Sequence, residues 1–387
     1  MSRTSHSAGA RLARGLFTLF ATLAFSVTSR GAEPIKFGEI ESMTGKEAAF
    51  GQSAHKGIVL AVEEINAKGG LLGRPVVIVL QDNQSRAGES ATIAKKLASR
   101  DKVAVVLSGA ISSNCNEAGP VLQNAKVPFI ATTATDASVT GAGNYVFRNC
   151  FVDEFQGAVM ARFARENLKL RRVALLTSAS AIASVNLSKI YRKTFTALGG
   201  EIPVEQKYSE GDKDFRAQLT AIKASGAEGL FVPGYYTEAA LVCRQARDLG
   251  LNIPIFGTDG WEAPELVAIG GKAVEGTYYS THYTSENTAP QVVAFVKKFR
   301  ARFSGEVPDS MAPLAYDAAL IAAAAITRAG TTDGPKVRAA IAATRDFPGI
   351  TGRTTIDAHR NASKDAVIVT VRGGQIKYVT TVTAIEP

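Results

Sequence analysis

Short apolar runs rich in β-branched residues recur along the chain from Ile35 onward, bounded by glycine, proline or polar residues. Because apolar residues occupy consecutive positions in most runs, they predict strands buried on both faces, as in parallel sheets covered by helices on each side. The runs are IKFGEIE at Ile35, PVVIVLQD at Pro75, VAVVLSG at Val103, VPFIA at Val127, RVALLT at Arg172, GLFVPG at Gly229 and IPIFGTD at Ile253.

Helical periods separate these strands. Ile58, Ala61, Val62 and Ile65 follow the i, i+3, i+4, i+7 spacing of one helix face, and the segment 155–163 has a similar pattern. The alternation of strand and helix predicts an α/β fold with doubly wound sheets.

Two such series occur, one ending near Cys150 and one running from about Arg172 to Tyr279, so two lobes are expected. Helical stretches after Pro290 and Met311 follow the end of the second series, so they are not needed to cover its sheet. We therefore expect the chain to cross between lobes more than once. A length of 387 residues, 46% of them hydrophobic, also fits two domains of ~100 to 200 residues each.

The first 32 residues have the pattern of a secretory signal peptide. Arg3, Arg11 and Arg14 precede an uncharged apolar run at 15–27, and small residues up to Ala32 follow it. The run is shorter than the ~20 residues that a transmembrane helix needs. We expect residues 1–32 to be cleaved and the protein to be periplasmic; a disordered leader or a retained anchor is the alternative.

The formal net charge of +9 comes partly from this leader. Without its four arginines, which include Arg30, the charge falls to +5, and the remaining basic residues form no block. We therefore expect no nucleic-acid partner.

No motif of an enzyme or a metal centre is present. The sequence lacks G-x-S-x-G, G-x-x-x-x-G-K-[ST], C-x-x-C and H-E-x-x-H. His6, His55, His282 and His359 are far apart and have no carboxylate at metal-ligand spacing, so surface or internally bonded histidines are expected. We predict a protein that is not an enzyme and uses no cofactor or metal.

The three cysteines, Cys115, Cys150 and Cys243, are too few and too scattered for a disulfide scaffold. After export, Cys115 and Cys150 could form a disulfide; buried thiols are the alternative.

Polar residues follow several predicted strands. Ligands of α/β sheets bind beyond the carboxyl ends of strands, near helix N-termini with free N–H groups. Residues 112–114 (SSN) and 133–135 (TAT) occupy such positions and suit a carboxylate, although helix capping is the alternative. Tyr235 and Asp259 follow two strands of the second series and suit an ammonium group; a packed tyrosine and a turn aspartate are the alternatives.

Six longer segments are more specific than any single residue. They are ESMTGKEAAFGQSAHKGIVLA at Glu41, EEINAKGGLLGRPV at Glu63, ATTATD at Ala131, YVFRNCFVDEFQG at Tyr145, EGDKDFRAQLTAIKASGAEGLF at Glu210 and GYYTEAALVCRQARDLGL at Gly234. In this order they resemble the leucine/isoleucine/valine-binding family of periplasmic proteins, and the resemblance covers nearly all of the chain after the leader.

The resemblance implies a type I periplasmic-binding fold, in which two lobes joined by three crossovers close over an amino acid. The lobes are then expected at 33–151 plus 282–352 and at 152–281 plus 353–387. The family's ligand-binding residues correspond here to Ser113, Thr133, Ala134, Thr135, Tyr235 and Asp259, with Phe50 near the pocket.

Two positions depart from the family pattern. Asp259 stands where some relatives have glutamate, which keeps the charge but shortens its reach. Ile182 falls near a family tyrosine, so one hydroxyl contact is missing. Phe50, Ile182 and Trp261 are candidate walls around the ligand side chain, and ordinary packing is the alternative.

The resemblance thus implies the solute-binding component of an ABC importer, acting as a monomer. It would capture a branched-chain or related amino acid and deliver it to the permease membrane subunits. A ligand sensor of the same fold, or a carrier of amides, urea or aromatic acids, is the alternative.

Overall fold

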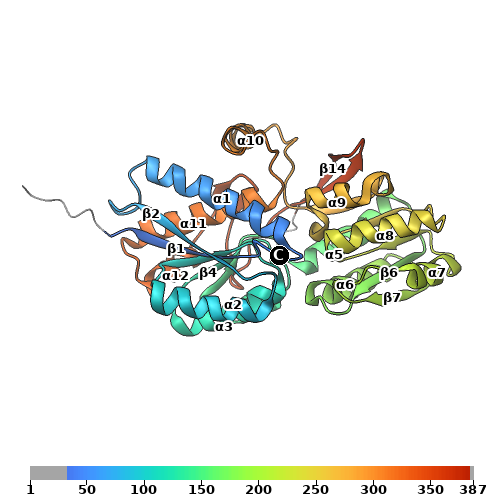
Figure 1. Ribbon diagram of the computed structural model, residues 1–387, viewed down its shortest axis with the longest axis horizontal. Helices are drawn as coiled ribbons and strands as arrows, with labels where there is room; N and C mark the ends of the chain where they lie inside the picture. Colours follow the sequence, from blue (N-terminus) through green and yellow to red (C-terminus); the bar gives the residue numbers. More distant parts are fainter. Residues whose placement is uncertain (1–32, 384–387) are drawn as a thin grey trace, which may run out of the picture. The chain divides into compact units, whose positions relative to one another are not determined.

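The computed structural model describes residues 33–383, so the expected signal peptide lies outside the described residues. Two β-sheets organise this part of the chain, and helices cover both faces of each (Figure 1). The α/β class expected from the sequence is confirmed.

The first sheet contains five parallel strands in the order β2-β1-β3-β4-β5. Helices α1 (Ala48–Ala67) and α11 (Met311–Ala329) cover one face, and α2 (Ala87–Lys96) and α3 (Ser112–Ala125) cover the other (Figure 1). The strands are β1 (Ile35–Glu41), β2 (Val76–Asp82), β3 (Val105–Ser108), β4 (Phe129–Ala131) and β5 (Val146–Arg148). Other helices in this part of the fold are α4 (Ser138–Gly141), α10 (Pro290–Arg302) and α12 (Gly334–Ala342).

The second sheet has the order β14-β13-β10-β9-β8-β6-β7. Strands β6 to β10 run parallel, and β13 runs antiparallel to both β10 and β14. The strands are β6 (Val173–Ser178), β7 (Glu205–Tyr208), β8 (Gly229–Phe231), β9 (Ile255–Gly257), β10 (Tyr278–Thr281), β13 (Ala366–Arg372) and β14 (Gln375–Val382). A separate hairpin pairs β11 (Phe347–Gly349) with β12 (Gly352–Thr354).

Helices pack on both faces of the second sheet as well. The core on one face includes residues of α5 (Asp153–Arg162) and α6 (Ile182–Ala197). The core on the other includes α7 (Arg216–Ala224), α8 (Tyr236–Asp248) and α9 (Pro264–Gly270).

Side-chain alternation explains why the strands appear as continuous apolar runs. In β3, Val105 and Leu107 join the core beneath α1 and α11, whereas Val106 joins the core beneath α2 and α3. In β8, Leu230 and Phe231 likewise belong to different cores. Because successive side chains of a strand point to opposite faces, a sheet with two cores needs apolar residues at every position.

The chain passes from the first sheet to the second between β5 and α5, returns after β10, and leaves again before β13. Ile356 and Ala362 pack in the core of the first sheet. This packing favours a last crossing close to Ala366 over the expected boundary at 353; the lobe boundaries themselves stay a prediction. No described helix combines the length and apolar character that crossing a lipid bilayer requires.

The cysteines are free, buried thiols, so the possible Cys115–Cys150 disulfide is absent. The Sγ atom of Cys115 lies 3.5 Å from the Ala110 carbonyl oxygen, and that of Cys150 lies 3.5 Å from the Ala134 carbonyl oxygen. Burial raises the pKa of both thiols to about 12, which favours the neutral form. Both side chains therefore act as hydrogen-bonded core residues.

Candidate ligand-binding cleft

A pocket lies beyond the carboxyl ends of parallel strands from both sheets. Its cavity is small, about 30 Å³, so its walls lie close together. The lining residues are Phe50, Ile111, Ser112, Thr133, Thr135 and Met311 from the first sheet and its helices, with Ala183, Ser184, Leu187, Pro233, Gly234, Tyr235, Thr258, Asp259 and Gly260 from the second. Among residues 33–383, no three His, Cys, Asp or Glu side chains are grouped so that they could hold a metal ion.

The wall on the first sheet offers hydrogen-bond donors. Ser112 begins the 14-residue helix α3, whose first N–H groups carry partial positive charge. The Ser112 hydroxyl oxygen accepts a hydrogen bond from the Asp136 N–H at 3.2 Å, so its own hydrogen remains available. The Thr133 hydroxyl donates to the Gly109 carbonyl oxygen at 2.9 Å, which fixes that side chain. The Ser112 hydroxyl and the first N–H groups of α3 suit a carboxylate.

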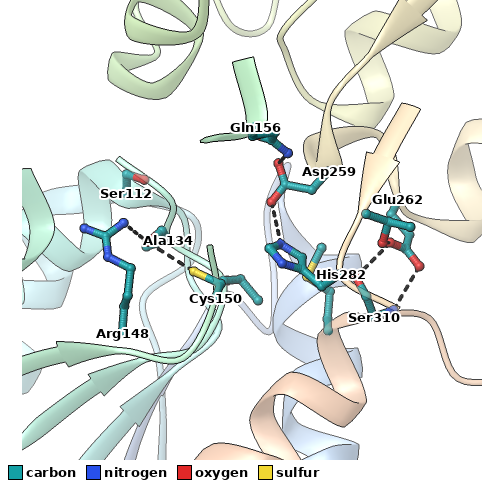
Figure 2. A network of polar contacts seen from close by, with 12 residues as sticks. Ser112, Ala134, Arg148, Cys150, Gln156, Asp259, Glu262, His282 and Ser310 are labelled. Atoms are coloured by element: carbon teal, nitrogen blue, oxygen red, sulfur yellow. Dashed lines mark hydrogen bonds and ion pairs between the residues drawn. The ribbon is translucent and has the colours of Figure 1, made fainter. Parts of the chain in front are cut away.

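Arg148 holds the loop that carries Thr133 and Thr135. Its side chain is fully buried and donates from Nη1 to the Ala134 carbonyl oxygen at 2.9 Å (Figure 2). Its Nη2 donates to the Asp136 carbonyl oxygen at 2.6 Å. The guanidinium also places a positive charge beneath this wall. Sequence reasoning missed Arg148, because nothing in RNC distinguishes a buried arginine from an exposed one.

The wall on the second sheet presents one carboxylate held by two side chains. Asp259 follows β9 and lies between Gln156 and His282 (Figure 2). Gln156 Nε2 donates to Asp259 Oδ1 at 2.7 Å, and His282 Nε2 lies 3.0 Å from Asp259 Oδ2. The carboxylate therefore has a fixed orientation and is 7% exposed.

His282 was expected to be a surface or internally bonded histidine, and Gln156 was not singled out. The structure shows a buried, internally bonded His282 whose partner is a candidate ligand-binding carboxylate. A signal existed, because His282 directly follows the parallel strand β10, just as other candidate residues follow their strands.

Aromatic rings connect the two walls. Phe50 of α1 meets the ring of Tyr235 edge-on at a centroid distance of 6.1 Å and that of Tyr236 at 5.1 Å. The Tyr236 hydroxyl donates to the Lys46 carbonyl oxygen at 2.7 Å. Gly260 has no room for a side chain, since a Cβ there would lie 2.6 Å from the Gly234 carbonyl oxygen. These contacts bring the strand ends into one crevice.

Five of the nine candidate residues from the family resemblance line the pocket: Phe50, Thr133, Thr135, Tyr235 and Asp259. Ser112, which the strand-end pattern indicated within residues 112–114, lines it as well. Tyr235 precedes α8 and Asp259 follows β9, so both come from the same edge of the second sheet. Nothing in this geometry tests ligand binding, which stays a proposal.

Four other residues from the sequence lie outside the lining. Ser112, the first residue of α3, lines the pocket, whereas the expected Ser113 does not. Ala134 contributes its carbonyl oxygen to Arg148. Ile182 is 39% exposed, and the next residues of α6 line the pocket in its place. Trp261 is fully buried and donates from Nε1 to the Val232 carbonyl oxygen at 2.9 Å, so it is a core residue.

Two buried carboxyl groups lie where the chain returns to the first sheet. Glu262 accepts hydrogen bonds from the Ser310 N–H at 2.9 Å and the Ser310 hydroxyl at 2.7 Å (Figure 2), and from the Thr281 hydroxyl. Burial, and then the neighbouring Asp309 carboxylate, raise the pKa of Glu262 to about 8. Burial raises the pKa of Asp309 to about 6. At pH 7, Glu262 is therefore mostly protonated in the folded protein, whereas Asp309 is mostly ionised.

Because the pKa values of these two carboxyl groups are raised, we predict that the free energy of unfolding falls as the pH rises. The ordinary pKa of Glu262 is 4.5, so from there to about 8 the folded state binds more protons than the unfolded state. Stability is then lost through this window, by up to about 1.4 kcal/mol per pH unit for one group. Glu262→Gln, which resembles the protonated form, should flatten the profile measured by urea unfolding between pH 5 and 9.

The control for this change is Glu154→Gln at an exposed position of α5. It should leave the profile as in the unmodified protein. An equally steep decline in Glu262→Gln would contradict the assignment of the falling limb to Glu262.

A donor-lined wall lies opposite an anionic wall, at the facing ends of parallel strands from two sheets, which is the arrangement typical of two-lobed binding proteins for small molecules. The chain belongs to the periplasmic binding protein family, whose model matches residues 34–375.

Individual relatives cover nearly the same length. The chain is 32% identical to a Leu/Ile/Val-binding protein of Rhizobium johnstonii over 87% of this chain and 91% of that protein. The structure of a leucine-binding protein from Thermotoga maritima is 36% identical, covering 90% of this chain and 99% of that one, with a TM-score of 0.87. The isoleucine complex of a branched-chain amino acid binding protein from Streptococcus pneumoniae is 32% identical, covering 89% and 99%, with a TM-score of 0.85.

Proposed function

We propose that this protein is the exported solute-binding component of an ABC importer and that its ligand is a branched-chain amino acid. The observation that carries the proposal is the position of Asp259 across one cleft from Ser112 and Thr135. Relatives named for binding leucine, isoleucine and valine support the choice of ligand. In this proposal the protein acts in the periplasm as a monomer and delivers its ligand to the permease membrane subunits.

The ligand would be held as a zwitterion. Its carboxylate would accept hydrogen bonds from Ser112, Thr135 and the first N–H groups of α3, while its ammonium would bind Asp259 and Tyr235. Because such a ligand contacts both walls, it binds the closed form better than the open form and shifts the population toward closure.

Polar contacts already join the two walls in the described conformation. Asn186 donates to the Asp136 carboxylate, and Lys46 Nζ lies 3.2 Å from a Glu210 carboxylate oxygen. The hydrogen bond from the Tyr236 hydroxyl to the Lys46 carbonyl oxygen also joins the two walls. These contacts would have to break for a ligand to enter, so we assign the described conformation to the closed form.

Apolar residues would select the ligand side chain. Phe50, Leu187 and Met311 line the pocket, and each CH₂ group that a ligand buries contributes about 0.8 kcal/mol, or about fourfold in affinity. We therefore expect leucine to bind more tightly than valine, and valine more tightly than alanine, in calorimetric titrations.

A thermal-shift panel tests the proposed function. Leucine, isoleucine and valine should raise the melting temperature, because a ligand that binds only the folded state stabilises it. Benzoate and urea serve as the comparison ligands. A shift with benzoate or urea alone, or with no member of the panel, would contradict an amino-acid ligand.

A further inference from the structure

His282 is buried and contacts the carboxylate of the proposed ammonium site. Its ring stacks on Phe151 at a centroid distance of 3.7 Å and an interplanar angle of 26°. Its Nε2 atom faces Asp259. Within residues 33–383, its buried Nδ1 atom has no hydrogen-bond partner.

This geometry distinguishes the two charge states of the imidazole ring. An imidazolium has an N–H at both nitrogens, so Nδ1 would carry a buried donor without an acceptor, which is costly. The neutral ring with its proton on Nε2 has a single donor, which Asp259 Oδ2 can accept at 3.0 Å, and leaves at Nδ1 only an acceptor lone pair without a partner in the described part of the chain. A neutral donor orients the carboxylate without cancelling its charge.

Gln156 acts in the same way on the other oxygen. Its amide is a neutral donor, 2.7 Å from Asp259 Oδ1. A carboxylate has about four lone-pair positions, of which these two bonds occupy one on each oxygen. The remaining positions of Asp259, which lines the pocket, are left for a ligand.

We propose that His282, as the neutral tautomer protonated on Nε2, is a positioning residue of the ammonium site. With Gln156 it holds Asp259 as an oriented anion that selects ligands carrying an α-ammonium group over those with a carboxylate alone. This inference rests on the proposed function. A ligand without the ammonium leaves Asp259 buried and unpaired, so leucine should bind at least about 30-fold more tightly than 4-methylpentanoate, its analogue without the amino group.

Two substitutions separate positioning from packing. His282→Phe keeps a ring against Phe151 but removes the donor, whereas His282→Gln keeps a neutral N–H donor at a similar reach. We expect His282→Phe to weaken leucine binding by about 10- to 100-fold and to lower the leucine to 4-methylpentanoate ratio by a similar factor. His282→Gln should retain most of both.

The outcomes distinguish this inference from the proposed function. The positioning role would be overturned if His282→Phe weakened the binding of leucine and of 4-methylpentanoate equally. It would also be overturned if His282→Gln lost as much leucine affinity as His282→Phe. If the unmodified protein binds no branched-chain amino acid, the proposed function itself fails. Calorimetry with leucine and 4-methylpentanoate gives all of these values.

A nitrogen NMR spectrum tests the tautomer without any substitution in the measured protein. The full chain has four histidines, and His282→Gln identifies the signals of His282 by their loss. In the leucine complex, Nε2 should have the chemical shift of a protonated nitrogen and Nδ1 that of an unprotonated one. Two protonated nitrogens would overturn the inference.

Discussion

Replacing Asp259 by asparagine is expected to weaken leucine binding by about 30-fold to several thousandfold. Truncating one partner of a desolvated charge pair costs on the order of 2 to 5 kcal/mol. The asparagine amide has nearly the same volume but no charge, and its NH₂ group would oppose a donor from Gln156, His282 or the ligand ammonium. Calorimetric titration with leucine measures the change.

Asp248→Asn is the matched control for this substitution. Asp248 is exposed in the last turn of α8 and is not part of the pocket lining, so the variant removes the same charge outside the cleft. Its leucine affinity should equal that of the unmodified protein. Unchanged affinity in Asp259→Asn, with urea unfolding that shows an intact fold, would exclude Asp259 as the ammonium partner.

Replacing Trp261 by alanine is expected to lower the free energy of unfolding by about 3 to 5 kcal/mol, because the change leaves a large cavity in a packed core. The indole is fully buried, lies 6.3 Å from the Tyr279 ring centroid, and donates from Nε1 to the Val232 carbonyl oxygen. Alanine also leaves that carbonyl oxygen without its partner. Urea unfolding measures the loss.

Trp261→Phe is the control. It removes the N–H donor but keeps an aromatic ring and most of the side-chain volume. Its loss of stability should be clearly smaller. The leucine affinity of folded Trp261→Ala should fall much less than that of Asp259→Asn, because Trp261 is absent from the pocket lining. A large loss of affinity with unchanged stability would instead make Trp261 a wall of the ligand site.

The sheets could be predicted because burial on both faces leaves a strong pattern. The runs at Ile35, Val103 and Ile253 contain β1, β3 and β9. Strands β13 and β14 were not predicted, although β13 is an apolar run, AVIVTVR, of the same kind. Their place in the second sheet depends on packing between segments far apart in the sequence, which local periodicity does not indicate.

The site was predictable only in part, for a related reason. Residues such as Thr135 and Asp259 could be found because ligands bind at strand ends. A one-residue error separated Ser113 from Ser112, since neighbouring positions of a helix face different directions. Gln156 and His282 are 103 and 23 residues from Asp259 in the sequence, so their contacts with it come from the tertiary fold.

A crystal structure of the protein with bound leucine tests the central claim most directly. The α-ammonium should lie within hydrogen-bond distance of Asp259, and the carboxylate should lie at the start of α3 beside Ser112 and Thr135. Leucine bound outside this cleft, or bound in the reverse orientation with its carboxylate toward Asp259, would contradict the account.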